Sequence, residues 1–227
     1  MLINVISMNK KSYIVGIFWM IMTSFFFVGV FVTVKYIGDD VPASQSAFLR
    51  YLFGTLILAP IILKSLKNTN KSLMKKFVIR GFFHAIGVTL WFYSMTVITM
   101  AEVTAIGFLT PIFICIGASF MFREKFTGFR FFAILVSFIG ALIILRPGFK
   151  LFEIGHGCML FAAFVFSFSY LIVKYVSEEK NSKEIVGYLS LFTTLFLIPM
   201  AIYDWESINN TNLFLLFLTA IIATFGH

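Results

Sequence analysis

The sequence predicts an all-α polytopic membrane protein that is built from an inverted repeat of five helices, the second repeat being incomplete. Three observations support this fold class. The composition is apolar, with 60% hydrophobic residues, 12% charged residues and a mean hydropathy of +0.97, whereas soluble domains carry about 25% charged residues. The apolar residues fall into eight long runs. The segment 16–60 returns, 139 residues later, as the segment 155–199.

Each apolar run is long enough to form a transmembrane helix, because about 20 helical residues cross a hydrocarbon core about 30 Å thick. In chain order, the predicted spans are 13–34, 44–63, 77–97, 104–122, 129–145, 155–175, 185–203 and 213 to the end. The segments between them are polar or carry turn residues, such as GDDVP, KNTNK, REKFTG, RPG and SEEKNSK. We therefore expect about eight transmembrane helices.

The distribution of Lys and Arg predicts the orientation of these spans, because both residues collect in cytoplasmic loops. With a cytoplasmic N-terminus, the inner side receives Lys10, Lys11, Lys64, Lys67, Lys71, Lys75, Lys76, Arg80, Arg123, Lys125, Arg130, Lys174, Lys180 and Lys183. The outer side receives Lys35, Arg146 and Lys150, and Arg50 stays inside a span. The net charge of +8 therefore reflects membrane topology, and we expect lipid rather than nucleic acid as the surrounding partner.

The repeated segment predicts two structural units of opposite orientation. Thirteen of the 45 aligned positions are identical, and the stretch VKYIGDD at 34–40 returns as VKYVSEE at 173–179. The first unit, 13–148, follows a cytoplasmic N-terminus at 1–12 and contains five spans. Because five is odd, the second unit, 155–227, enters the membrane from the other face. It contains three spans, so about eight of an expected ten helices are present. Inverted repeats are typical of secondary transporters, whose substrate site lies near the membrane midplane between the repeats.

Three stretches resemble the EamA-type branch of the drug/metabolite transporter superfamily. AEVTAIGFLTPIFICIGASFMFREKF at 101–126 is similar to the family's fourth helix, GALIILRPG at 140–148 to the end of its fifth helix, and FLRYLFGTLILAP at 48–60 to its second helix. The resemblance implies a secondary carrier in the bacterial inner membrane that works by alternating access. Within the family, it favours uptake of S-adenosylmethionine or a similar small polar metabolite.

Two charged residues are candidates for substrate binding. A charged side chain inside a span costs roughly 2.5 to 3.5 kcal/mol unless it finds a partner or a cavity, so we interpret Arg50 as a cavity residue that pairs with a substrate carboxylate. The alternative is that Arg50 extends to the outer headgroups. Glu102 either closes a capping box with Thr99 or faces the outer vestibule, where it binds a substrate cation or exchanges a proton.

Aromatic and flexible positions complete the predicted site. Trp91, Tyr93 and Trp19 are candidate contacts for a sulfonium or an adenine ring, and lipid contact is the alternative role for each. His84 is a candidate proton relay, with simple packing as the alternative. Three prolines interrupt predicted helices and are candidate flexing points for alternating access: Pro60, Pro111 and Pro199.

The sequence contains no motif for catalysis, for a metal or for another cofactor. The three histidines, His84, His156 and His227, share no metal-binding spacing, and no phosphate-binding loop is present. We therefore expect a carrier rather than an enzyme. Two alternatives stay open: an exporter of amino acids or drugs with the same fold, and a non-transporting fragment of a split or truncated carrier gene. A homodimer of two such chains is a further expectation.

Overall fold

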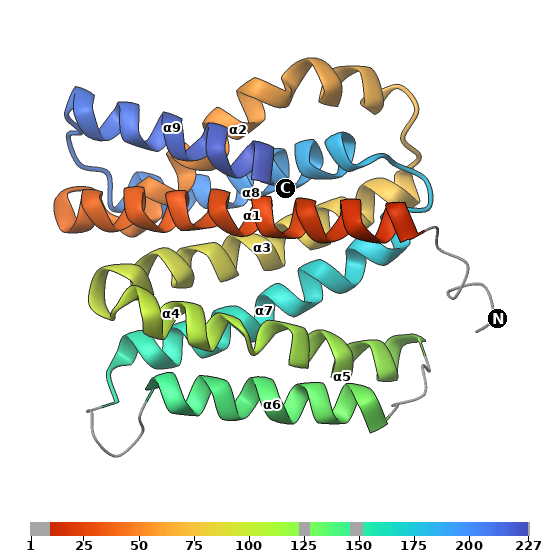
Figure 1. Cartoon of the computed structure of the whole chain (residues 1–227). Helices are drawn as coiled ribbons and strands as arrows, with labels where there is room; N and C mark the ends of the chain where they lie inside the picture. The colour runs from red at the N-terminus through yellow and green to blue at the C-terminus, as the bar shows by residue number, and fades with distance from the viewer. Residues whose placement is uncertain (1–9, 123–127, 146–151, 227) are drawn as a thin grey trace.

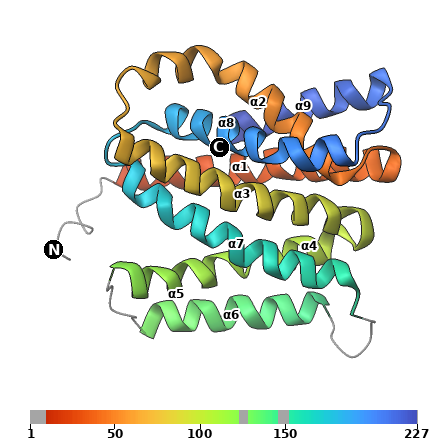
Figure 2. The same cartoon turned by 180° about the vertical axis from the view of Figure 1, so that it is seen from behind.

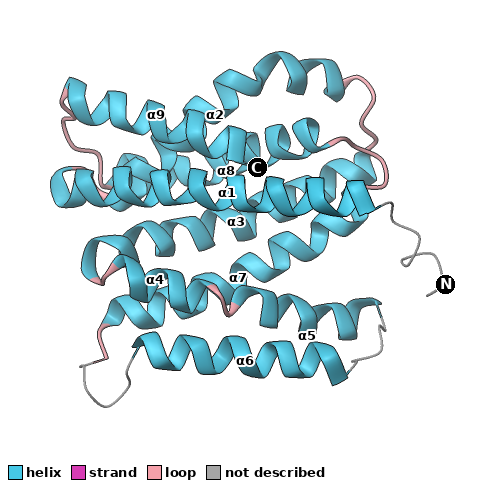
Figure 3. Cartoon of the chain, viewed as in Figure 1, coloured by secondary structure: helices cyan, strands magenta, loops and turns pink. Residues whose placement is uncertain are grey.

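The computed structural model describes residues 10–122, 128–145 and 152–226, and these residues form helices without any strand (Figures 1 and 3). The α-helices are α1 (Lys10–Ile37), α2 (Ala43–Leu66), α3 (Lys71–Val97), α4 (Met100–Gly107), α5 (Thr110–Phe122), α6 (Gly128–Leu145), α7 (Ile154–Val176), α8 (Ser182–Tyr203) and α9 (Asn210–Gly226), and a short 3-10 helix, η1 (Gly38–Asp40), follows α1. The all-α prediction is confirmed for this part of the chain. Residues 1–9 of the expected N-terminal segment lie outside it.

Six segments of the described chain are long and apolar enough to cross a membrane. They are Ile14–Ile37, Ala43–Leu66, Lys71–Val97, Met100–Phe122, Ile154–Val176 and Ser182–Tyr203. Helix α9 has 17 residues, and at 1.5 Å per residue it is about 26 Å long, shorter than the hydrocarbon core. The protein is thus a multi-pass membrane protein, while the expected count of eight spans is not confirmed.

The predicted span 104–122 is not one continuous helix. Helix α4 ends at Gly107 and α5 begins at Thr110, so a break separates them. Pro111 explains this break, because proline has no N–H to donate to the carbonyl four residues earlier, that of Gly107, and its ring clashes with that carbonyl. The Phe108 N–H donates to the Thr104 carbonyl at 3.1 Å and closes α4. The other two prolines, Pro60 and Pro199, lie inside continuous helices.

The two ends of the bundle differ in charge. The loops between α2 and α3 and between α7 and α8 lie at one end, which we call the basic end because its helix termini carry Lys64, Lys67, Lys71, Lys75, Lys76, Lys174, Lys180 and Lys183. This end also carries Glu178, Glu179 and Glu184. The opposite end, which we call the acidic end, carries Asp40, Glu102, Glu153, Asp204 and Glu206 together with Lys35.

Helices α2 and α8 pack against each other near the centre of the fold. Gly54 permits close contact, because a Cβ atom at this position would lie 3.3 Å from Ser190 Oγ. One turn away from Ser190, the hydroxyls of Thr55 and Thr194 form a hydrogen bond of 3.1 Å. These two threonines are 139 residues apart, which is the offset of the sequence repeat. Around this pair, α3 packs on α7 and α1 packs on α9 (Figures 1 and 2).

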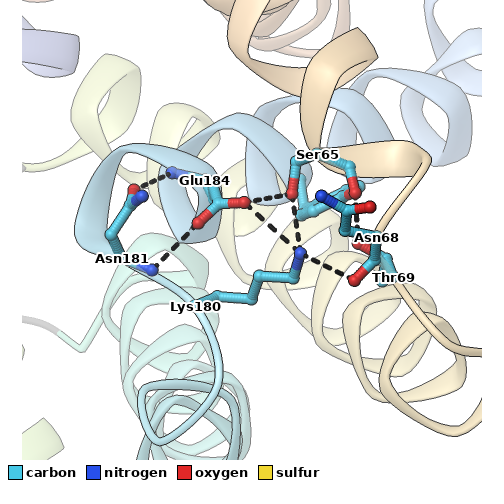
Figure 4. A network of polar contacts seen from close by, with 7 residues as sticks. Ser65, Asn68, Thr69, Lys180, Asn181 and Glu184 are labelled. Carbon is cyan, nitrogen blue, oxygen red and sulfur yellow. Dashed lines mark hydrogen bonds and ion pairs between the residues drawn. The ribbon is translucent and has the colours of Figure 1, made fainter.

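Polar contacts join α2 and α8 at both ends. At the acidic end, Ser44 Oγ donates to Asp204 Oδ2 at 3.0 Å, and the Gln45 side chain exchanges two hydrogen bonds with the Glu206 backbone, at 3.0 and 3.1 Å. At the basic end, Ser65 Oγ donates to Glu184 Oε1 (Figure 4).

Lys180 extends the network at the basic end. Its Nζ donates to Ser65 Oγ at 2.9 Å, to the Asn68 carbonyl at 3.3 Å and to Glu184 Oε1 at 3.3 Å (Figure 4). Asn181 and Glu184 also form a capping box, which begins α8. These contacts connect the loop between α2 and α3 with the loop between α7 and α8.

The interior contains a second buried arginine, Arg80, which the charge count places on the inner side. Arg80 lies inside α3, and only 4% of its surface is exposed. It follows Phe77, which stacks on Tyr188 of α8 with ring centroids 4.4 Å apart. A count of charges does not show whether a side chain near a helix end points into the bundle, so the burial of Arg80 was not predicted.

The contact between α3 and α8 predicts a strong effect of a single methyl group. A Cβ atom at Gly81 would overlap Phe192 and approach its backbone carbonyl carbon to 3.1 Å. We expect Gly81→Ala to destabilise the fold by about 1 to 3 kcal/mol, because the helices must separate. The measurement is the thermal unfolding midpoint in detergent. Gly16→Ala is the control: nothing lies within 4 Å of that position, and alanine favours the helix by up to about 1 kcal/mol. Equal midpoints for the two variants would contradict this packing.

Candidate functional site

A cavity of about 410 Å³ lies between α1, α2, α3, α7 and the break between α4 and α5. Its volume is in the range of about 300 to 1,000 Å³ that is usual for small-molecule sites. Its walls are mainly apolar, and their aromatic side chains include Phe27 and Phe31 of α1, Trp91 of α3, and Phe166 and Tyr170 of α7. Edge-on contact with Phe31, at a centroid distance of 5.2 Å, positions the Trp91 ring.

Arg50 supplies the positive charge of this cavity. It lies two turns into α2 and is 7% exposed. Its guanidinium carbon is 3.9 Å from the centroid of the Tyr51 ring, a distance at which a cation and an aromatic face attract each other. Its Nε atom is buried without a hydrogen-bond partner among the described residues. The described lining contains no carboxylate, so the guanidinium can accept an anionic group from a ligand.

His84 connects three helices at the cavity wall. Its Nε2 lies 2.7 Å from the hydroxyl of Tyr51 in α2, and its Nδ1 lies 3.3 Å from the hydroxyl of Ser169 in α7. The Phe166 ring lies 4.9 Å from the imidazole, centroid to centroid. An imidazole between two hydroxyls can take up or release a proton at either nitrogen. The arrangement can therefore carry a proton as well as fix the position of Tyr51.

The break between α4 and α5 brings backbone groups to the cavity. Gly107, Thr110 and Pro111 all line it. Because Pro111 cannot donate to the Gly107 carbonyl, this acceptor is left without its helical partner. Met159 of α7 adds a polarizable thioether opposite the break. The site thus combines a cation, aromatic faces and a backbone acceptor.

Glu102 forms the predicted capping box at the start of α4. Its Oε2 accepts hydrogen bonds from the Thr99 N–H at 2.9 Å and from the Thr99 hydroxyl at 2.7 Å, and its own N–H donates to that hydroxyl at 3.3 Å. Its Oε1 lies 3.8 Å from Nε2 of His156. His156 Nδ1 accepts from the Glu153 N–H at 3.1 Å. The capping prediction is confirmed, and Glu102 also faces an imidazole.

Arg50 and Glu102 line different cavities. Glu102 belongs to an open pocket of about 790 Å³ at the acidic end, together with Lys35, Glu153 and His156. Lys35 Nζ donates to the carbonyls of Met95 and Ile98 at the end of α3, at 2.8 and 3.3 Å. The structure therefore does not bring the two predicted charged residues into one site.

Four of the predicted site residues line the central cavity: Arg50, His84, Trp91 and Pro111. Tyr93 and Trp19 are 38% and 61% exposed and are not among the lining residues described. Tyr93 cannot share the Trp91 face, because two helical steps rotate a side chain by about 200°. Pro60 and Pro199 lie in α2 and α8, away from this lining.

Sequence reasoning missed Tyr51, Tyr170 and Thr110 as lining residues. One signal was present in α3, where His84, Val88 and Trp91 follow at intervals of four and three and so share one helix face. All of them line the cavity. The two tyrosines carried no comparable signal, because aromatic residues are frequent throughout the chain.

The hydrogen bond between Tyr51 and His84 predicts a measurable stability effect. Tyr51→Phe leaves the buried His84 Nε2 without its hydroxyl partner, so we expect a loss of about 1 to 3 kcal/mol in the free energy of unfolding. Tyr93→Phe is the matched control, because Tyr93 is exposed. Thermal unfolding in detergent measures both variants. A loss of the same size in Tyr93→Phe would show that the Tyr51 hydroxyl has no special role.

Residues 14–146 match the sequence model of the EamA-like transporter family. The chain is 27% identical to the S-adenosylmethionine uptake transporter of Rickettsia prowazekii, over 95% of this chain and 74% of that protein. It is 29% identical to the riboflavin transporter of Vibrio cholerae, with the same coverage. It is 22% identical to the pseudopaline exporter of Pseudomonas aeruginosa, over 84% of this chain and 67% of that protein. Because the family match covers more than half of the chain, the protein belongs to the EamA-like transporter family.

Proposed function

We propose that this transporter takes up S-adenosylmethionine, or a similar small polar metabolite, across the bacterial inner membrane without ATP. One observation carries the proposal: the buried cation Arg50 lines an apolar, partly aromatic cavity whose described lining contains no carboxylate. Such a site suits a ligand that combines a carboxylate with a planar or cationic group. The similarity to transporters named for S-adenosylmethionine supports this substrate.

The chemistry of S-adenosylmethionine matches the parts of the cavity one by one. Its carboxylate would pair with the two forked nitrogens of Arg50, a geometry that lysine cannot reproduce. Its sulfonium and adenine would rest against Trp91 and the neighbouring aromatic rings. The Gly107 carbonyl, which cannot receive the helical hydrogen bond from Pro111, would accept a hydrogen bond from the substrate's ammonium group if it points into the cavity. Glu102, in the separate pocket at the acidic end, would attract this ammonium group before the substrate reaches Arg50.

We also propose that transport uses two inverted repeats that alternate between outward-open and inward-open states. Several contacts support this symmetry. Helices α2 and α8 occupy equivalent positions in the two repeats, and their hydrogen bond joins equivalent residues, Thr55 and Thr194. Gln45 and Glu184 are equivalent as well: Gln45 ties the start of α2 to the segment after α8, and Glu184 ties the start of α8 to Ser65 of α2. Under the same symmetry, the packing of α1 on α9 corresponds to the packing of α7 on α3.

The proposed orientation places the N-terminus and the basic end in the cytoplasm. Lysines dominate this end of the described chain, whereas the acidic end carries Lys35 alone among the described lysines. Cytoplasmic loops carry the excess of Lys and Arg. In this orientation the Glu102 pocket faces the outside, where uptake begins. His84 would act as the proton relay if transport is coupled to protons.

Export is the alternative, and the relative named as a pseudopaline exporter supports it. Transport measured separately from each face of the membrane discriminates between uptake and export. We expect labelled S-adenosylmethionine to accumulate in bacteria that express the chain. Excess unlabelled S-adenosylmethionine should abolish this accumulation. Excess riboflavin or amino acids should leave the accumulation unchanged. Accumulation only in inside-out vesicles would instead establish export.

Arg50 provides the first test of the proposed site. We expect Arg50→Gln to raise the KM for S-adenosylmethionine uptake by about tenfold or more, because a charge-assisted pair with the carboxylate is lost. Arg50→Lys should recover only part of this loss. Lys75→Gln, which removes an exposed charge from α3, is the matched control, with membrane insertion checked for each variant. Wild-type KM in Arg50→Gln would refute the role.

The aromatic wall provides an independent test. We expect Trp91→Leu to weaken S-adenosylmethionine binding roughly 2- to 30-fold, which corresponds to one lost cation–π contact, and Trp91→Phe to weaken it less. Trp19→Leu should have no effect, because Trp19 lies outside the described lining. Binding can be measured by calorimetry on purified protein. If Trp19→Leu weakens binding as much as Trp91→Leu does, the measured binding does not take place in the central cavity.

A further inference from the structure

Arg80 is the second arginine that is buried in the bundle, and the proposed function does not yet use it. Its Nη1 donates to the carbonyl of Ile185 at 2.9 Å, which ties α3 to the start of α8. Its Nε has no hydrogen-bond partner in the described part of the chain. A guanidinium has five N–H donors, so the bond to Ile185 uses a small part of this capacity.

No carboxylate forms an ion pair with Arg80 within the described residues. Glu184 is adjacent to Ile185, but its carboxylate is engaged by Ser65 and Lys180 (Figure 4). An unpaired charge inside a membrane span is costly, and such residues mark substrate or ion pathways. A neutral donor could make one bond to a backbone carbonyl without this cost. The charge of Arg80 therefore requires an explanation other than the tie to α8.

Arg80 lies next to the central cavity, on its basic-end side. His84 follows one turn later on the same face of α3 and lines the cavity. The His84 Nε2 atom lies 2.7 Å from the hydroxyl of Tyr51, a lining residue, so Arg80 is one helical turn from this contact. The guanidinium carbon of Arg50 lies 3.9 Å from the centroid of the same Tyr51 ring. Arg50 belongs to the part of α2 near the acidic end, whereas Arg80 belongs to the part of α3 near the basic end.

We propose that Arg80 is a second anion-binding residue of the transport path, which takes the substrate's carboxylate from Arg50 when the bundle opens toward the basic end. Two successive cations keep the carboxylate paired during its passage through a low-dielectric region. The inference deepens the proposed function and rests on it for the identity of the anion. The attraction of an anion by Arg80 is independent of the substrate and can be tested separately.

The first experiment measures this attraction without any substrate. A cysteine replaces Tyr170 in a background of Cys115→Ala and Cys158→Ala. It is labelled with an anionic reagent, methanethiosulfonate ethylsulfonate, and with a cationic one, methanethiosulfonate ethyltrimethylammonium. We expect Arg80→Gln to lower the ratio of anionic to cationic labelling rates about fivefold or more, as loss of a nearby charge requires. Arg80→Lys and the exposed control Lys75→Gln should preserve the ratio. An unchanged ratio in Arg80→Gln would overturn the proposal.

The second experiment compares the two faces of the membrane, using intact cells for the outer face and inside-out vesicles for the inner face. We expect Arg80→Gln to raise the half-saturating S-adenosylmethionine concentration about tenfold at the inner face and to leave it unchanged at the outer face. Equal effects at both faces would indicate a structural role and contradict the proposal. If the wild-type protein transports no S-adenosylmethionine, the proposed substrate fails, and the labelling ratio alone decides the role of Arg80.

Discussion

The packing of α2 against α8 is the contact on which the rest of the structure depends. Small side chains bring the two helices together at Gly54, and the Thr55 and Thr194 hydroxyls join them at the same level. Polar contacts then tie both ends of the pair, through Gln45 at the acidic end and Glu184 at the basic end. In a membrane, where apolar surface alone does not drive association, close packing and hydrogen bonds of this kind hold helices together.

The cavity lies on the side of α2 that faces α1, α3 and α7, and none of the described lining residues belongs to α8. Helix α2 contributes Arg50 and Tyr51, while α1, α3 and α7 contribute aromatic walls. The hydrogen bonds of His84 link the hydroxyls of α2 and α7 through α3. The central site is therefore built from side chains of several helices, and a small shift of α3 or α7 relative to α2 changes all of its contacts together.

The sequence was sufficient to predict most of the helical segments, since each apolar run is long and its boundaries are polar, but it predicted one helix where α4 and α5 are separate. It also predicted the Thr99 and Glu102 capping box, because this motif is local and its geometry follows from three-residue spacing. It could not separate Trp91 from Tyr93, since only packing determines which face of α3 points inward. The burial of Arg80 was not predicted for the same reason. The sequence could not predict properties that depend on contacts between distant helices, such as the separation of Arg50 from Glu102.

The break before Pro111 has a consequence for how such a site can change over evolutionary time. A carbonyl group that the backbone presents to a ligand survives every substitution of the surrounding side chains. If the proposed site is correct, specificity would change at positions such as Arg50 or Trp91, while this part of the recognition would stay the same. A protein of this construction can acquire a new solute by few mutations, which agrees with relatives that bear the names of solutes as different as S-adenosylmethionine, riboflavin and pseudopaline.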